Sequence, residues 1–205
     1  MAERPTIGLD RALDLAMNTE GWLSPVEACA LYLLAKGRKG GRVVEIGSWK
    51  GRSTIMLAAG CSDREEQPHD IMRKVWAIDT FQGSAEHQAN GPVWTFDEFK
   101  NNIKKAGLDD WVNPLVGFSA DHAKVYNKVA IGLLFIDGAH DYASVRNDLY
   151  LWWPYLMVGG TVALHDCNWS GPGRVMQEEL IAQPQRCKDF EVYGSMFVGI
   201  KEGQW

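Results

Sequence analysis

V-V-E-I-G-S-W-K-G-R-S-T, residues 43–54, is the stretch that decides the fold. It opens with an apolar run typical of a buried strand, turns between Gly47 and Gly51, and continues into a helix-like run over residues 53–59. Glycine has no Cβ, so such a turn can bend sharply and a ligand can approach its backbone. The first N–H groups of the helix point toward that ligand. The stretch therefore predicts an α/β sheet with a ligand site where the first strand ends.

The same stretch argues against a dinucleotide cofactor. The fingerprint of NAD sites is G-x-G-x-x-G, whereas residues 47–51 read G-S-W-K-G. Glu45 precedes this turn, and its carboxylate would repel a pyrophosphate but attract a sulfonium or an α-amino group. The pattern E-I-G-S-x-x-G-R-S-T resembles the first motif of class I S-adenosylmethionine (SAM)-dependent methyltransferases. The stretch alone leaves open an ordinary strand–helix turn with a chance glutamate.

Length and composition are those of an ordinary globular protein. The chain has 205 residues, of which 46% are hydrophobic and 23% charged, which suits a single domain, residues 1–205, with a helical cap over residues 1–40. The net charge is −5 and no Lys/Arg-rich run occurs, so a nucleic-acid partner is not favoured. No apolar stretch is long enough for a membrane span.

Localisation is expected to be cytoplasmic. The first ten residues hold no apolar signal core. The four cysteines form no C-x-x-C pair, so the sequence suggests neither a zinc site nor a disulfide framework.

Strands alternate with helices along the chain. Strands are expected at residues 43–46, 75–78, 111–116, 131–136 and 161–164, followed by a hairpin of 190–193 and 196–200. Helices are expected at residues 9–18, 25–36, 53–59, 95–106, 142–155 and 174–182, with capping boxes at 24–27 and 95–98 and a Pro154 kink. Loops are expected at 62–70 and 80–91, and a turn at Gly159-Gly160. This order predicts a Rossmann-like, doubly wound, seven-stranded sheet, mostly parallel, with one antiparallel strand from the hairpin.

Polar groups follow four of the expected strands. They are Glu45 with the glycine turn, Asp79, Asp137 with His140, and His165 with Asp166. The carboxyl ends of parallel strands meet at one edge of a sheet, where ligands bind. There, Asp79 could accept hydrogen bonds from two ribose hydroxyls, although a helix-capping aspartate is the alternative.

Two later segments extend the resemblance over nearly the whole chain. I-D-G-A-H-D-Y and W-P-Y-L-M-V-G-G-T-V-A-L-H-D are similar to the Methyltransf-24 group of methyltransferases, kin to catechol and macrocin O-methyltransferases. The resemblance implies SAM as cofactor. Its expected contacts are Glu45, Gly47, Ser48, Gly51, Arg52, Ser53, Asp79, Thr80, Phe81, Ser119 and Asp137.

The resemblance also implies catalytic residues and a metal. In the catechol relatives the acids at the positions of Asp137 and Asp166 bind Mg²⁺, and the residue at the position of His140 is the base. The third ligand would be Asn168, because Cys167 stands directly after Asp166 and a thiol is a poor ligand for Mg²⁺. An imidazole suits the removal of a hydroxyl proton, so the chemistry supports the base more than the metal.

The sequence therefore predicts an O-methyltransferase. It would move a methyl group from SAM to a hydroxyl of a phenol, catechol or sugar, with His140 and Asp137 as catalytic residues and Mg²⁺ as a candidate cofactor. The alternatives are an NAD(P)-dependent Rossmann oxidoreductase and a SAM-binding protein without catalysis. His165 is expected to be structural, because its neighbours claim the opposite face of the strand. The early helices and the hairpin could pack a homodimer, but no pattern demands it.

Overall fold

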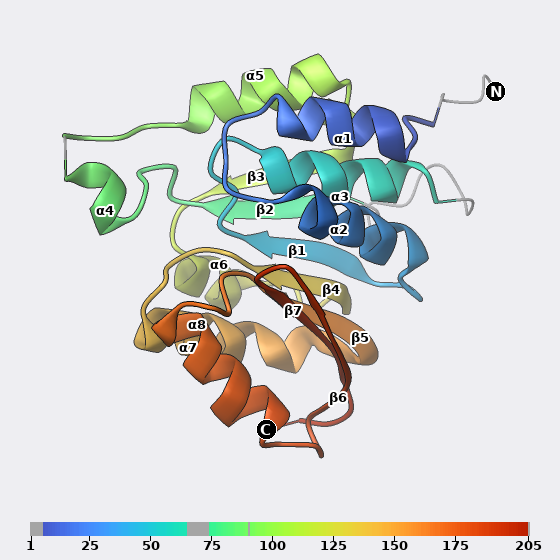
Figure 1. Ribbon diagram of the computed structural model, residues 1–205, viewed down its shortest axis with the longest axis vertical. Helices are drawn as coiled ribbons and strands as arrows, with labels where there is room; N and C mark the ends of the chain where they lie inside the picture. Colours follow the sequence, from blue (N-terminus) through green and yellow to red (C-terminus); the bar gives the residue numbers. More distant parts are fainter. Residues whose placement is uncertain (1–5, 65–73, 90, 205) are drawn as a thin grey trace.

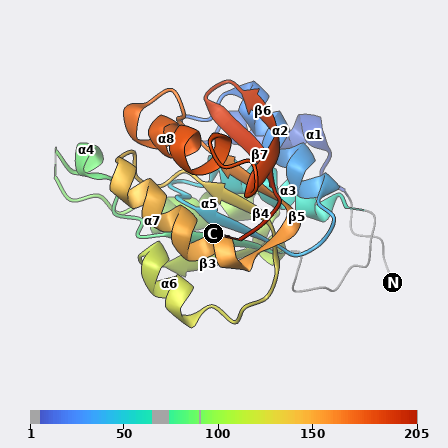
Figure 2. The same ribbon diagram turned by 90° about the horizontal axis from the view of Figure 1, so that it is seen from below.

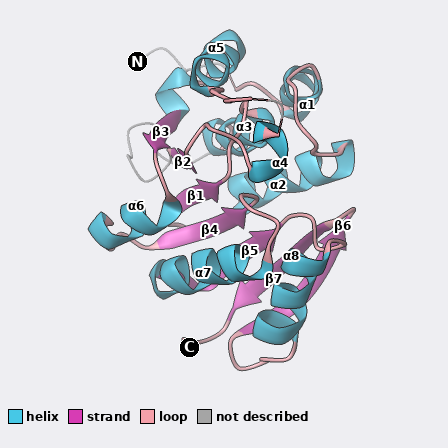
Figure 3. Ribbon diagram, turned by 90° about the vertical axis from the view of Figure 1, so that its left-hand side faces the viewer, coloured by secondary structure: helices cyan, strands magenta, loops and turns pink. Residues whose placement is uncertain are grey.

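The computed structural model describes residues 6–64, 74–89 and 91–204. Its centre is a seven-stranded sheet of order β3-β2-β1-β4-β5-β7-β6. The strands are β1 (Arg42–Ile46), β2 (Val75–Asp79), β3 (Val112–Val116), β4 (Ile131–Ile136), β5 (Leu156–Leu164), β6 (Cys187–Tyr193) and β7 (Met196–Lys201). The first five pair in parallel, and β7 runs antiparallel between β5 and β6 (Figure 3). The predicted fold class is confirmed.

Helices cover both faces of the sheet (Figure 1). One layer contains α1 (Leu9–Met17), α2 (Pro25–Gly37), α3 (Arg52–Ser62) and α5 (Phe96–Ala106). The opposite layer contains α6 (Ser119–Val125), α7 (Tyr142–Trp152) and α8 (Ser170–Val175). Short segments are α4 (Ala85–Gln88), η2 (Asp109–Trp111), η3 (Trp153–Tyr155) and the π-helical η4 (Met176–Ile181).

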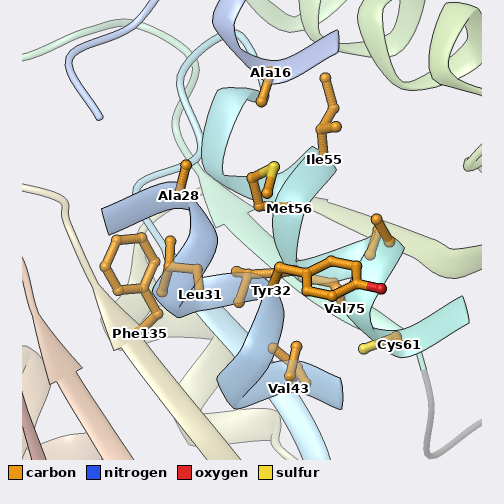
Figure 4. Packing of buried hydrophobic residues seen from close by; sticks show 14 of the residues in the cluster. Ala16, Ala28, Leu31, Tyr32, Val43, Ile55, Met56, Cys61, Val75 and Phe135 are labelled. Atoms are coloured by element: carbon orange, nitrogen blue, oxygen red, sulfur yellow. The ribbon is translucent and has the colours of Figure 1, made fainter. Parts of the chain in front are cut away.

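The central strands are buried because both of their faces carry apolar side chains. Val43 and Phe135 point into the core beneath α2 and α3, whereas Val44 and Leu134 point into the core beneath α7. Figure 4 shows the first of these cores, where Leu31 of α2 lies close to Phe135 of β4. Side chains alternate across a strand, so a continuous apolar run serves two cores at once.

The N-terminal helices close one face of the sheet, as expected. In α2 the capping box of Ser24 and Glu27 is present, and Glu27 Oε2 accepts the N–H of Ser24 at 2.8 Å. The α2 helix contacts α3 and reaches β6 of the hairpin (Figure 2).

The second predicted capping box is wrong. Thr95 precedes α5 but makes no side-chain cap bond. Its hydroxyl instead lies 3.4 Å from the carbonyl oxygen of Trp49, so a tertiary contact replaces the local one.

Other boundaries also differ from the sequence prediction. The β5 strand runs through Gly159-Gly160 without a turn, and the extra residues form an irregularity where its register against β4 shifts. The last helix begins at Ser170 and continues as η4. The expected loop over residues 80–91 contains α4, and α6 had no sequence prediction. Most of the expected loop over residues 62–70 lies outside the described residues.

Candidate active site

A cavity of about 760 Å³ lies where the parallel strands end. Its walls come from the glycine turn, from the ends of β2, β4 and β5, and from residues 20–23 before α2. Two non-glycine residues that line it have positive φ, namely Trp49 (48°) and Asp166 (54°). Such backbone strain is typical of functional sites.

Gly47 fits the first bend of the turn because no side chain could. Its φ is 89°, and a Cβ there would lie 2.1 Å from the carbonyl oxygen of Asp137. Gly51 at the other end has φ 93° and packs toward Phe99 and Ile103 of α5. Gly47 therefore allows the end of β1 to pack closely against the end of β4, and Gly51 allows the turn to pack against α5.

Glu45 lies beneath the turn and is fully buried. Its carboxylate accepts hydrogen bonds from Ser48 Oγ (2.8 Å), Ser53 Oγ (2.6 Å) and Thr54 Oγ1 (2.5 Å). Burial raises the pKa of Glu45 to about 7, although the three hydroxyls oppose the shift. In this structure the carboxylate ties β1 to the first turn of α3.

Asp79 holds the same turn from the other side. Its Oδ2 accepts the N–H groups of Ser48 (2.8 Å) and Trp49 (2.7 Å), and its Oδ1 accepts the N–H of Phe81 (2.7 Å). Asp79 also lines the cavity. Three of its roughly four acceptor sites are used by the turn, so Asp79 keeps one on Oδ1 for a ligand hydroxyl.

Arg52 ties the N-terminal segment to the turn. Its side chain donates to the carbonyl oxygens of Thr19 (2.7 Å) and Leu23 (3.1 Å). The residues between these carbonyls form part of the cavity wall.

Charged side chains gather at the ends of β4 and β5. His165 Nδ1 lies 3.0 Å from Asp137 Oδ1 and 3.4 Å from Asp166 Oδ2. Its N–H is not aligned for a hydrogen bond with either oxygen, so we treat the attraction as ionic. Burial works against the charged imidazole, but Asp137 and Asp166 outweigh it and raise the pKa of His165 to about 11.

The two acids are affected differently. Burial raises the pKa of Asp137, although the charge on His165 opposes this. Burial also disfavours the charged form of Asp166, but the imidazoles of His140 and His165 outweigh it and lower its pKa. Of the two carboxyl groups, that of Asp166 is therefore the one that stays ionised more readily.

His140 lies beside Asp166 at the cavity wall. Its Nε2 is 3.1 Å from Asp166 Oδ2, and its ring centroid is 4.7 Å from that of Trp169. Trp169 lines the cavity and is 47% exposed. A carboxylate in this position orients an imidazole and stabilises its protonated form.

Two of the three expected metal ligands, Asp137 and Asp166, lie together with His140. Among the described residues, Asp137, His140 and Asp166 bring one ligand atom each within 4.8 Å of one another. Asn168 is exposed. Cys167 Sγ points back to the carbonyl oxygen of Leu164 at 3.3 Å, and burial raises its pKa to about 12.

Most of the predicted site residues line this one cavity. They are Gly47, Ser48, Arg52, Ser53, Asp79, Thr80, Ser119, Asp137, His140 and Asp166. Glu45, Gly51, Phe81 and Asn168 are not among its lining residues. Phe81 is buried against the rings of Phe96 and Phe99.

The structure adds functional candidates that sequence reasoning missed. His165 reaches Asp137 on one side, and its Nε2 lies 3.4 Å from Glu27 Oε2 on the other. The H-D pair after β5 was the available signal in the sequence, but the alternation of side chains along the strand led us to expect a structural role for His165. Glu27 was visible only as a helix cap, because its partner Ser195 lies 168 residues away in sequence.

An aromatic group lines the opposite wall of the cavity. The ring centroids of Trp49 and His87 are 4.5 Å apart, and those of Trp22 and His87 are 5.1 Å apart. These rings come from the glycine turn, from α4 and from the segment before α2. No local pattern connects them.

Comparisons with known proteins agree with this geometry. A family model described as a methyltransferase domain, Methyltransf-24, matches residues 44–167, which span β1 through the loop after β5. The chain belongs to this family. The match covers both the glycine turn and the Asp137–His140–Asp166 group.

One individual relative has a low sequence identity to this chain. An 8-demethyl-8-(2,3-dimethoxy-alpha-L-rhamnosyl)-tetracenomycin-C 4'-O-methyltransferase from Streptomyces olivaceus is 28% identical over 160 residues, which cover 70% of this chain and 59% of that protein. The chain thus matches less than two thirds of the length of this relative.

Solved structures share the fold. An O-methyltransferase from Bacillus cereus in complex with SAH (S-adenosylhomocysteine) superimposes with a TM-score of 0.62 and 20% identity, covering 94% of this chain and 90% of that one. The O-methyltransferase TomG from Streptomyces achromogenes in complex with SAM superimposes with a TM-score of 0.66 and 16% identity, covering 95% of this chain and 89% of that one. None of the described helices has the length and apolar composition needed to cross a bilayer.

Proposed function

We propose that this protein transfers the methyl group of SAM to a hydroxyl group of a small molecule. The observation that carries the proposal is the His140–Asp166 pair, which lies in the same cavity as the glycine turn and Asp79. The turn and Asp79 suit a nucleoside, and the pair suits removal of a hydroxyl proton. Membership of the methyltransferase family supports SAM as the nucleoside.

The chain's own groups give the cofactor its orientation. Asp79 would accept one ribose hydroxyl at the end of β2, and the backbone of Gly47 and Ser48 would hold the amino-acid part of SAM. Asp137 stands across the turn from Gly47, where its carboxylate attracts the α-amino group of SAM. The sulfonium methyl would then be held in the cavity that His140 also lines.

Methyl transfer is an in-line displacement. The acceptor oxygen attacks the methyl carbon, the C–O bond forms, the C–S bond breaks, and its electron pair goes to sulfur. The hydroxyl proton passes to His140, and Asp166 stabilises the resulting imidazolium. Because Nε2 faces Asp166, the nitrogen that takes the proton is Nδ1, which is buried in this structure.

The residues present fit Mg²⁺ poorly. Mg²⁺ is usually held by one or two carboxylates together with several waters, but here the carboxylates of Asp137 and Asp166 are already paired with imidazoles. His165 brings a second positive group to within 3.0 Å of Asp137 Oδ1. We therefore assign no step to a metal, and the Mg²⁺ hypothesis is left to an experiment described below.

The cavity favours a neutral ring as acceptor. No lysine is among its described lining residues, and its one arginine, Arg52, already donates to two carbonyl oxygens. Anionic groups such as phosphates are normally held by such cations. Trp22, His87 and Trp169 offer aromatic faces instead, which suit either a phenol or a sugar ring.

The test uses His140→Ala with His122→Gln as a matched control, since His122 lies on α6 outside the cavity lining. Methyl transfer is measured with labelled SAM and a panel of catechols and methyl α-L-rhamnoside. We expect His140→Ala to lower kcat by roughly 10²–10⁴-fold, the usual contribution of a general base, with SAH affinity unchanged. Unchanged kcat would refute the base assignment.

The other readings correspond to distinct outcomes. SAH binding without turnover of any acceptor would favour a SAM-binding protein without catalysis. Failure of the folded wild-type protein to bind SAH would refute the proposal and bring a nicotinamide cofactor back into consideration.

A further inference from the structure

We propose that Asp148, oriented by Ser119, recognises the 6-amino group of the cofactor's adenine and makes the site selective for adenosyl over inosyl compounds. The inference rests on the proposed function, because it takes a SAM-like nucleoside as the ligand of the cavity. Sequence reasoning assigned Ser119 to the cofactor but did not consider Asp148.

A chain of two hydrogen bonds fixes the Asp148 carboxylate. The indole Nε1 of Trp152 donates to Ser119 Oγ at 2.9 Å, and Ser119 Oγ donates to Asp148 Oδ1 at 2.6 Å. An indole N–H can only donate, so the single hydroxyl proton of Ser119 must point to the carboxylate. Trp152 is fully buried, so the chain starts from a fixed point in the core. Ser119 is therefore a positioning residue that has no proton left for the cofactor.

The second carboxylate oxygen faces the cavity. Among the described residues, no donor makes a hydrogen bond to Asp148 Oδ2. A Cβ built on Gly138 would lie 3.8 Å from this oxygen, so Oδ2 borders the space over the Gly138 backbone. Gly138 and Asp148 both line the cavity. An acceptor atom is thus presented to the ligand beside a surface without a side chain.

The position of this oxygen suits the base of the nucleoside. Asp79 at the end of β2 marks the ribose, and His140 beyond β4 marks the methyl group. A further part of the cavity is lined by Phe118 and Ser119 after β3 and by Asp148 of α7. Phe118 is 68% exposed and offers a face on which a planar base can stack.

The chemistry of the carboxylate selects for an amino group. Adenine carries a donor at position 6, and an ionised carboxylate can only accept. Hypoxanthine carries a carbonyl oxygen there, which would face Oδ2 with like partial charge. Burial raises the pKa of Asp148 to about 6, so most of the carboxyl is ionised at pH 7.5. A site built around such a bond rejects an analogue that lacks the donor.

The experiment compares SAH with S-inosylhomocysteine by calorimetry at pH 7.5. We expect wild-type protein to prefer SAH by at least about 10-fold, as for one hydrogen bond to a charged group. Asp148→Asn should remove or reverse this preference, because a carboxamide can donate to the inosyl oxygen. Asp121→Asn is the control, since Asp121 is exposed and pairs with Lys124 outside the cavity lining.

Each outcome decides the inference. Equal wild-type affinity for the two ligands would overturn it, and so would an unchanged preference in Asp148→Asn. If Asp148→Asn does not fold, Ser119→Ala serves instead: it keeps the carboxylate but removes its orienting bond, and should weaken SAH binding and reduce the preference. An unchanged preference in Ser119→Ala would then overturn the inference. Wild-type protein that is folded but binds neither ligand would refute the proposed function itself.

Discussion

Replacing Glu45 with glutamine tests how this structure accommodates a buried carboxylate. Glu45 is fully buried and accepts three hydroxyl groups from the turn and from α3. Burial raises its pKa from 4.5 to about 7. Between these two values the folded protein therefore binds more protons than the unfolded chain does, and the free energy of unfolding falls as pH rises.

The magnitude follows from the size of the shift. One pKa unit corresponds to about 1.36 kcal/mol, so the shift of Glu45 makes the wild-type protein about 3 kcal/mol less stable at pH 8 than at pH 4 through this residue alone. Glutamine does not titrate. The difference in stability, wild type minus Glu45→Gln, should therefore fall by about 3 kcal/mol over that range.

The assay is urea unfolding of both proteins at several pH values between 4 and 8, followed by circular dichroism. Comparing the two proteins at each pH cancels the titration of all other groups, provided the mutation leaves them unperturbed. A stability difference that does not change with pH would refute the reasoning, because Glu45 would then stay ionised throughout despite its burial.

Two further predictions concern the other charged groups. Glu27→Gln should lower the free energy of unfolding at pH 7 by about 1–3 kcal/mol, the usual range for hydrogen bonds to a charged group, because Glu27 accepts from both Ser24 and Ser195. The control is Glu98→Gln on the exposed face of α5. Equal stability of the two variants would contradict the prediction. Bonds from Ser24 and Ser195 outweigh burial and lower the pKa of Glu27 to about 2, so its contribution is complete above pH 4.5 and is lost as pH falls toward 2. Removal of divalent metal with EDTA should leave methyl transfer within about twofold of its rate with Mg²⁺, because the oxygen ligands that Mg²⁺ needs, the carboxylates of Asp137 and Asp166, are already paired with His140 and His165. A complete loss of turnover that Mg²⁺ restores would show that a metal is required.

Local patterns in the sequence were sufficient for the fold and for the prediction that several polar residues meet at one edge of the sheet. The continuous apolar run of β4 can be buried only on both faces, and Gly47 stands in a strand-to-helix turn where its φ is 89°. Both properties are short-range, so they could be read from neighbouring residues. Asp79, Asp137 and Asp166 follow strands of a parallel sheet, and this topology alone brings them to one edge.

Tertiary structure decided which partners those residues have. Thr95 has the sequence of a helix cap, but its hydroxyl turns to the carbonyl of Trp49 instead. His165 has a strand position that points to the core, yet the core at that place contains Glu27 and Asp137. The orientation of Asp148 depends on Ser119, 29 residues earlier in the chain. Burial, ionisation and hydrogen bonding depend on atoms that are distant in sequence, so only the folded chain determines them.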